Sequence, residues 1–428
     1  MPGEADDTPT ATIRLDAPVG EDGDGGLGLP IDEIRARLHD SGWLDAIAAA
    51  GLGFVVLLGI GGVLTLALKL NFPEVGAADP LAAFNAIVIA SLGVLGTPVV
   101  LDGVLLAVVP LGALAAAGAG VIWAVHASLR NSVPPSLAAG VRFGARVAVP
   151  FALLCWFFAL VFRFRGQHPV SADAGVALIA GAFWGATFGI LGAISAVESL
   201  RTTGTRLLAG IKAKQKDWYE GITTGGLMLA GVALAGLAAT LLWIIVALAQ
   251  GAPGKQFGLG DAIAYAVYLA AFLPNVVVAV TALSLGAPVD VGARVNLGGE
   301  LVGPVREYSL GSWGRGDPMP LVYLLTLIPI AACIGGGFIA RRRTSTPGAM
   351  VNVLLVASAI FSIVLTLLVA IGPLRLAGVV KGSGYGEVAP DIVVTFLFAF
   401  LASGILGAAG WKLAESTSLL RRRFPSVR

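Results

Sequence analysis

The sequence predicts an all-α fold, a polytopic transmembrane helix bundle with about 8–10 membrane helices. Three observations support this class. Long apolar runs occupy most of the chain, and each has about 17–27 residues, enough to cross a hydrocarbon layer of ~30 Å. Only 13% of the residues are charged, about half the proportion of a soluble domain. Glycine is abundant, with 58 of 428 residues, which favours close helix packing in lipid.

The N-terminal segment is polar and precedes the first apolar run. Residues 1–30 are rich in acids and are expected to form a disordered, acidic cytoplasmic tail. Residues 31–43 are amphipathic, with Ile31, Ile34 and Leu38 on one helical face. They predict a helix that rests on the bilayer surface.

Ten apolar runs follow, in two halves at 44–196 and 223–411. Gly96 to Pro98 break the second run, with Asp102 just beyond, and Pro274-Asn275 interrupt the seventh. We therefore expect these two elements to be broken or re-entrant. The ten runs are 44–67, 80–95, 104–127, 147–164, 174–196, 223–249, 262–285, 320–340, 350–371 and 391–411.

The distribution of lysine and arginine favours eight crossings. If all ten runs cross, basic residues divide evenly between the two sides, against the usual cytoplasmic excess. If the second and seventh do not cross, most basic residues gather on one side. With this arrangement we expect both termini in the cytoplasm. The expected location of the protein is the inner (plasma) membrane.

A short internal similarity suggests a duplication of five elements. Residues Leu105–Leu111 resemble Leu324–Ile330, and each segment follows one of the broken elements. Matched halves with irregular elements are common in transporters. Chance similarity between membrane sequences is the alternative.

No residue pattern predicts catalysis, a cofactor or a bound metal. The three histidines, His39, His126 and His168, are far apart and form no metal-ligand spacing. Cys155 and Cys333 lie inside apolar runs and are expected to be buried and unpaired. The net charge of +2 does not suggest a nucleic-acid partner. The expected partners are membrane lipids and membrane proteins of the envelope or the division machinery.

Four residues at the broken elements are candidate substrate or hinge positions: Asn85, Asp102, Pro274 and Asn275. An asparagine beside a proline can satisfy the carbonyl that the proline leaves free, so a structural kink is the alternative to a substrate site. Gly181, Gly185 and Gly189 recur every four residues and predict a helix-packing stripe, within the bundle or in a dimer interface.

Three connecting segments complete the expected organisation. Residues 286–319 predict a long extracytoplasmic loop and a candidate interaction surface. Residues 197–222 predict a basic cytoplasmic loop, in which Lys212, Lys214 and Lys216 would face anionic headgroups. Residues 412–428 predict a basic cytoplasmic tail.

Residues Phe272–Val277, the glycine-rich segment after Gly286 and the stretch Val388–Asp391 resemble two families of polytopic membrane proteins from high-GC actinobacteria. One is the "streptophobe" group, and the other is the PerM-like group linked to cell division. The resemblance extends over about 260–411 and implies a non-enzymatic membrane protein, but it supplies no site residues.

Two functions are expected from these observations. The first is a non-enzymatic multi-pass membrane protein that acts through protein partners in envelope or division processes. The alternative is a secondary transporter or permease with its site near Asn85 and Asn275. An intramembrane enzyme would need reactive side chains that face a cavity, and the sequence offers only Asp102 and arginines at the ends of the runs.

Overall fold

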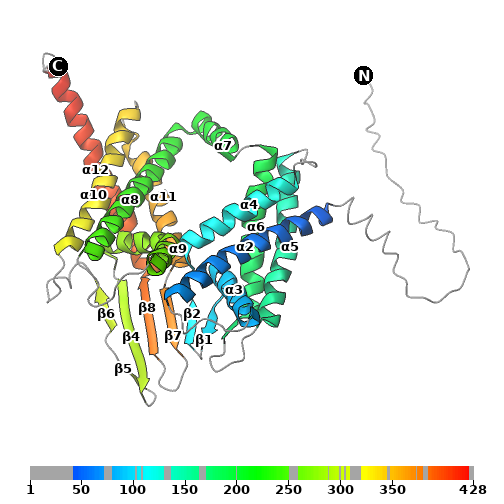
Figure 1. Ribbon diagram of the computed structural model, residues 1–428. Helices are drawn as coiled ribbons and strands as arrows, with labels where there is room; N and C mark the ends of the chain where they lie inside the picture. The colour runs from blue at the N-terminus through cyan, green and yellow to red at the C-terminus, as the bar shows by residue number, and fades with distance from the viewer. Residues whose placement is uncertain are drawn as a thin grey trace, which may run out of the picture. The chain divides into compact units, whose positions relative to one another are not determined.

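A computed structural model describes residues 42–423 with internal gaps (Figure 1). The gaps are 72–79, 102–103, 108, 130–135, 163–169, 199, 250–258, 288, 298–299, 303–304, 309–319, 345–347, 373 and 379–383. The expected acidic tail and nearly all of the expected surface helix, at 1–30 and 31–43, lie outside the described residues, as does Asp102. Residues from Gly42 onward belong to one compact unit.

Within the described residues, eleven helices form the main body of this unit. They are α2 (Trp43–Asn71), α3 (Pro80–Val94), α4 (Leu111–Ser128), α5 (Leu137–Val161), α6 (Ala174–Val197), α7 (Leu200–Lys214), α8 (Lys216–Ala249), α9 (Leu259–Ser284), α10 (Pro320–Arg343), α11 (Met350–Ile371) and α12 (Ile392–Arg423).

Eight of the described helices are long and apolar enough to cross a membrane, which confirms the prediction of a polytopic helix bundle. They are α2, α4, α5, α6, α8, α9, α11 and α12. The charge distribution also predicts eight crossings, but that set contains α10 and leaves out α9. The α10 helix has 24 residues and ends in Arg341, Arg342 and Arg343, while α3 is a shorter apolar helix.

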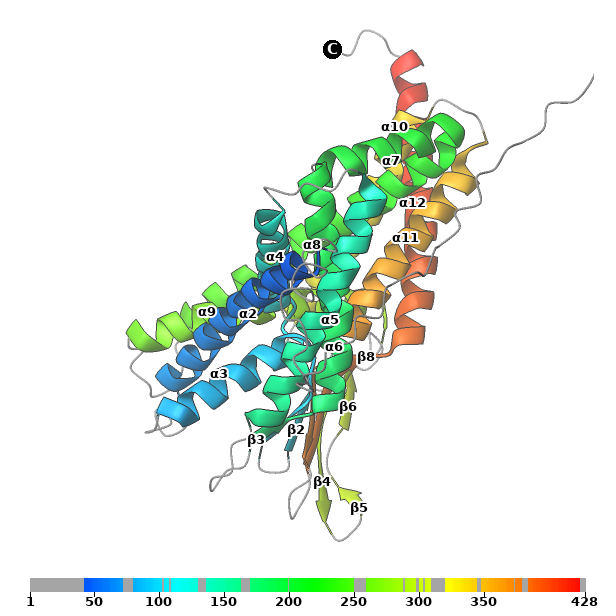
Figure 2. The ribbon, with the colours of Figure 1, turned by 90° about the vertical axis from the view of Figure 1, so that its right-hand side faces the viewer.

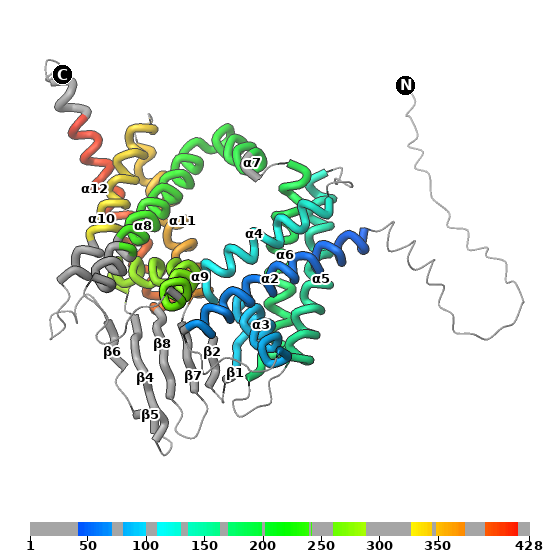
Figure 3. The backbone as a smooth tube through the Cα atoms, viewed as in Figure 1, coloured from blue at the N-terminus to red at the C-terminus, as the bar shows by residue number. Residues whose placement is uncertain are grey.

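The helices pack in two groups (Figure 3). In the first group α2 contacts α3, α4 and α5, and α6 contacts α4 and α5. In the second group α8 contacts α10 and α11, and α12 contacts both of these helices. Helix α9 contacts α2 and α4 as well as α8, α10 and α11, so it lies between the two groups.

The described residues also form an antiparallel sheet of eight strands, which the predicted all-α bundle did not include. Its order is β3-β1-β2-β7-β8-β4-β5, and β6 also pairs with β4. The expected loop at 286–319 contains three of these strands and is therefore not one long irregular segment. The strands are β1 (Val99–Leu101), β2 (Val104–Ala107), β3 (Val170–Ala172), β4 (Val289–Leu297), β5 (Glu300–Val302), β6 (Val305–Tyr308), β7 (Leu374–Gly378) and β8 (Gly384–Pro390).

The basic segments at 197–222 and 412–428 also differ from expectation. The first forms α7 and the start of α8, and in the second α12 continues as a helix to Arg423. Charged residues that alternate with small apolar ones in these segments suggested loops next to a membrane span. The same pattern is compatible with the exposed face of a helix.

The order of elements repeats along the chain. Residues 43–197 run helix, helix, hairpin, helix, helix, strand, helix. Residues 216–423 repeat the order of the helices with α8 to α12, but three strands (β4 to β6) stand in place of the hairpin and two (β7 and β8) in place of the single strand. The helix contacts repeat as well, because each contact among α2, α4, α5 and α6 has a counterpart among α8, α10, α11 and α12. We call these segments the first copy and the second copy.

The strand pairing repeats residue by residue. In the first copy Val99 pairs with Ala172 and Leu101 with Val170. In the second copy Val289 pairs with Pro390 and Val291 with Val388, which is the same register. The positions of β2 against β1 and of β6 against β4 also correspond.

The buried faces of equivalent helices correspond too. The buried positions of α6 all recur in α12 at a constant separation along the chain. Those of α6 are Ala177, Gly181, Gly185, Gly189, Gly192 and Ala193, and those of α12 are Thr395, Ala399, Ser403, Gly407, Gly410 and Trp411. Asp173 and Asp391 precede the two helices, and the Oδ1 atom of each accepts a hydrogen bond from the backbone N–H three residues later. These agreements support the predicted five-element duplication.

The short sequence match that suggested the duplication is itself out of register. Ile122 of α4 lies against Gly192, and Ile334 of α10 lies against the equivalent Gly410. This packing aligns Ile122 with Ile334. The short sequence match instead aligns Pro110 with Pro329, which is shifted by two helical turns from the alignment that the packing gives. Apolar residues recur along any membrane helix, so a similarity of seven residues does not fix the register.

Glycines hold α5 and α6 in close backbone contact. A Cβ atom at Gly189 would lie 2.6 Å from the carbonyl oxygen of Gly144, and one at Gly185 would lie 3.1 Å from the Cα atom of Ala148. Gly59 of α2, in contrast, has no neighbouring atom within 4 Å of such a position.

Replacing Gly189 with alanine should therefore destabilise the protein, by about 1–3 kcal/mol for an overpacked contact. The matched substitution Gly59→Ala should be neutral or stabilising by up to about 1 kcal/mol, because alanine has the higher helix propensity. Thermal unfolding in detergent tests this pair. Equal midpoints for the two variants would contradict the packing described here.

Candidate functional site

The side chain of Asn275 joins three elements that are far apart in sequence. Its Oδ1 atom accepts a hydrogen bond of 2.9 Å from the backbone N–H of Leu111, at the start of α4. Its Nδ2 atom donates to the carbonyl oxygens of Val109, at 2.7 Å, and Gly372, at 3.1 Å. Gly372 is the residue that ends α11. We call this set of contacts the Asn275 junction.

These contacts satisfy groups that helix ends leave free. The first backbone N–H groups of α4 and the last carbonyls of α11 have no partner inside their own helices. In a membrane protein such groups need a partner from elsewhere in the protein. Both N–H bonds of the Asn275 amide point to backbone carbonyls, so its donors are already used.

The two predicted asparagines occupy equivalent positions in the two copies. Asn85 of α3 and Asn275 of α9 each stand ten residues before a matching pair, Leu95-Gly96 and Leu285-Gly286. Gly96 and Gly286 have φ angles of 88° and 98° and end their helices with the same backbone hydrogen bonds. Asn85 and Asn275 are therefore equivalent positions of the two copies.

The environments of the two asparagines differ, however. Helix α9 lies between the two groups of helices, whereas α3 packs on α2, α4 and α5 of its own copy. Asn85 is buried there, 9% exposed. Asn85 takes no part in the hydrogen bonds of the Asn275 junction, so the structure does not join the two asparagines in one site.

Pro274 lies inside α9, directly before Asn275. The proline ring removes one backbone donor from the helix interior, and the Asn275 side chain bonds to groups of other elements, not to its own helix. Helix α9 is nevertheless continuous from Leu259 to Ser284, so the expectation that this element is broken or re-entrant at Pro274-Asn275 is wrong. The Asn275 side chain joins α9 to α4 and α11. The observed contacts favour a structural role over a substrate site.

The predicted glycine stripe packs inside the chain. Gly181, Gly185 and Gly189 face α5, against residues that include Ala152 and Phe151. This is the bundle-packing alternative of the sequence prediction. The two cysteines are unpaired and buried, as expected, with Cys155 beside Gly181.

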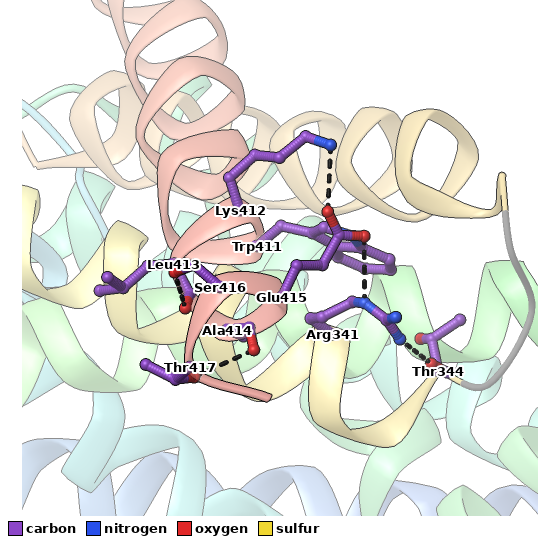
Figure 4. Close-up of polar contacts among 9 residues, drawn as sticks. All are labelled: Arg341, Thr344, Trp411, Lys412, Leu413, Ala414, Glu415, Ser416 and Thr417. Carbon is purple, nitrogen blue, oxygen red and sulfur yellow. Dashed lines mark hydrogen bonds and ion pairs between the residues drawn. The ribbon is translucent and has the colours of Figure 1, made fainter. Parts of the chain in front are cut away.

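Polar side chains also connect the ends of α10 and α12 (Figure 4). Arg341 Nε lies 3.2 Å from Glu415 Oε1, and Arg341 Nη1 donates to the Thr344 carbonyl. Glu415 also accepts from the indole of Trp411 and pairs with Lys412 at 3.0 Å. The charged side chains of both ion pairs are about one-third exposed or more. These ion pairs therefore orient the helix ends and contribute only about 0–1 kcal/mol each to the stability of the protein.

Among the described residues, no group of histidine, cysteine and carboxylate side chains could hold a metal ion. Sequence reasoning missed the connection that Asn275 makes to α4 and α11, because the partner groups belong to the backbone and have no signature. Its position beside Pro274 was the only signal available.

No protein-family profile, curated protein or solved structure matches this chain. The fold and the positions of the helices define a multi-pass membrane protein built from two copies of one unit. The resemblance to the streptophobe and PerM-like groups stays a prediction.

Replacing Asn275 with alanine should weaken the contact between the two groups of helices. The change leaves three backbone groups without their partner, and we expect a loss of about 1–3 kcal/mol in the free energy of unfolding. The control is Asn352→Ala, because Asn352 is exposed on α11. Unfolding in detergent measures both, and an unchanged midpoint for Asn275→Ala would contradict the junction.

Proposed function

We propose that this chain is a non-enzymatic, multi-pass protein of the inner membrane that acts through protein partners in envelope or division processes. The observation that carries the proposal is the single sheet to which both copies contribute. It offers an extramembrane platform, and it joins the two groups of helices at one face.

The sheet supports the same orientation for both copies. Strands β1 and β4 occupy equivalent positions in the two copies. Between them the sheet has an even number of antiparallel pairings, which pass through β2, β7 and β8. They therefore run in the same direction. Repeats of this kind are parallel, in contrast to the inverted repeats of many transporters.

This orientation supports eight crossings. Each copy has strands after its second and fourth helices, and all of them lie in one sheet, so those helices end on one side of the membrane. Suppose that the first, third, fourth and fifth helices of each copy cross the membrane. The second helix, which is α3 or α9, then begins and ends on the same side as the sheet. Figure 2 shows the sheet and α7 at opposite ends of the helices. The positive charges of α7 favour the cytoplasm for that end, with the sheet outside and both termini inside.

The same sheet is unfavourable for a transporter in which the halves separate. Val104 to Ala107 of the first copy pair with Arg375 to Gly378 of the second, and the Asn275 junction lies between the same two groups of helices. An outward opening between the copies would have to break this backbone ladder. A permease that works without such an opening is the remaining alternative.

A cysteine pair can lock the copies together. Leu105 and Ala377 are directly paired in β2 and β7, so Leu105→Cys with Ala377→Cys should form a disulfide across the ladder. For a partner-binding protein we expect partner capture by crosslinking, and rescue of a deletion strain, at the wild-type level with and without a reductant. A loss of rescue that the reductant restores would instead favour a transporter whose halves separate. The single cysteine variants are the controls.

Membrane topology can be measured independently. In whole cells, a membrane-impermeant thiol reagent should label Glu300→Cys in β5 but should not reach Gly204→Cys in α7. Gly260→Cys, at the start of α9, should be labelled from the same side as Glu300→Cys, since α9 is expected to return to the sheet side. Labelling of the Gly260 position from the α7 side would contradict eight crossings.

A further inference from the structure

One edge of the repeated unit is filled by a strand in the first copy and open in the second. Strand β2 pairs with β1 on one side and with β7 on the other. Its equivalent in the second copy is β6, which pairs with β4 in the same register. Within the described residues, β6 has no strand on its outer side (Figure 1). Strand β7 therefore shows how a strand fits the edge that β6 leaves open.

The pairing of β2 with β7 also gives the register of such a strand. Leu105 of β2 is paired with Val100, and Glu307 of β6 is paired with Asp290, the equivalent of Val100. Leu105 and Glu307 are thus equivalent positions. On its other side, Leu105 is paired with Ala377 of β7. A strand added to β6 in the same way would run antiparallel to it and place its own equivalent of Ala377 opposite Glu307.

A second copy of this chain has no outer strand that runs in the required direction. Strand β3 is antiparallel to β1, and β5 and β6 are antiparallel to β4. Since β1 and β4 run in the same direction, these three outer strands do so too.

The membrane keeps this direction the same in every copy. The strands extend away from the helices (Figure 2), and all copies have one orientation relative to the bilayer. Pairing between the outer strands of two copies would therefore be parallel in every combination. All the pairings described in this sheet are antiparallel, which is the more stable arrangement per residue. The missing strand is better supplied by a different protein.

The charges of β6 restrict which strand fits. Glu307 and Asp290 are directly paired, so two acidic residues occupy opposite positions. Like charges in this arrangement are unfavourable, and a lysine or arginine opposite Glu307 in an added strand would offset their repulsion. The equivalent pair in the first copy, Leu105 with Val100, is uncharged. Charged residues on an edge also oppose the addition of unmatched strands.

We propose that the outer edge of β6 binds an extended segment of a partner protein, which adds a strand antiparallel to β6 with a basic residue opposite Glu307. In this mode of recognition, main-chain hydrogen bonds supply affinity and alternate side chains supply specificity. The inference rests on the proposed partner-binding function and identifies the part of the sheet that makes the contact.

Disulfide tethering to a synthetic peptide tests this edge. The full-length protein carries Tyr308→Cys, and its two native cysteines are replaced with alanine. The peptide has the sequence of residues 372–381, which contain β7, with Leu376→Cys to meet the new cysteine in the predicted register. One form of the peptide carries Ala377→Lys and the other Ala377→Glu. Protein and peptide are equilibrated in detergent over a range of β-mercaptoethanol concentrations, and the linked protein is quantified by intact mass spectrometry.

The lysine peptide should stay linked at a concentration of reductant at least about threefold higher than the glutamate peptide, because it removes the repulsion at Glu307. With Glu307→Lys in the protein, the order of the two peptides should reverse. Equal behaviour of the two peptides on both proteins would overturn the basic residue in the proposal.

Methylation of peptide nitrogens tests the backbone ladder itself. Two forms of the lysine peptide carry N-methyl groups on alternate residues, so each lacks the N–H donors of one of its edges. One form should lose the tether and the other should keep it, because only one edge of an added strand faces β6. Equal behaviour of the two forms would overturn strand addition.

Two further outcomes separate this proposal from its alternatives. Disulfide-linked dimers of the Tyr308→Cys protein, formed without peptide at the same concentrations of reductant, would show that a second copy occupies the edge and would overturn the proposal. Partner capture by the chain locked through Leu105→Cys and Ala377→Cys does not depend on the peptide results. Strand addition at β6 can therefore fail while the proposed function stands.

Discussion

The pairing of β2 with β7 is the contact on which the arrangement of this protein depends. Each copy has its own closely packed helices, and lipid gives two such bundles little hydrophobic reason to associate. The backbone ladder between β2 and β7 supplies a directional connection between them. The Asn275 junction adds a second connection, where one amide satisfies the ends of α4 and α11. Together with the packing of α9 on α2 and α4, they fix the relative orientation of the two copies.

The sequence was sufficient for the features that depend on lipid as a solvent. Apolar length and low charge predict the helices, and all eight candidate spans lie close to predicted runs. Proline suggested a break in α9, which is instead one continuous helix, but the Leu-Gly turns that follow α3 and α9 prove to be equivalent in the two copies. These signals are local, so one sequence carries them.

The sheet could not be predicted in the same way. Its strands are mostly three to five residues long and connect residues from opposite ends of the chain, such as Leu105 and Ala377. The alternation of Val289, Val291 and Val295 in β4 was a weak strand signal within an expected loop. For the candidate site, the residue type and position of Asn275 were visible, but its bonds go to backbone groups of distant helices. The register of the duplication likewise depends on contacts such as Ile122 with Gly192, which apolar repetition conceals.

The common direction of β1 and β4 has a consequence for how such a chain could arise. A segment that enters and leaves the bilayer on one side can be joined to a second copy of itself without reversing the insertion of either. Only a short connector is then needed, and α7 fills that position between α6 and α8. Once tandem fusion has produced two such segments, one can keep the glycines that hold it together while the interior of the other is free to change.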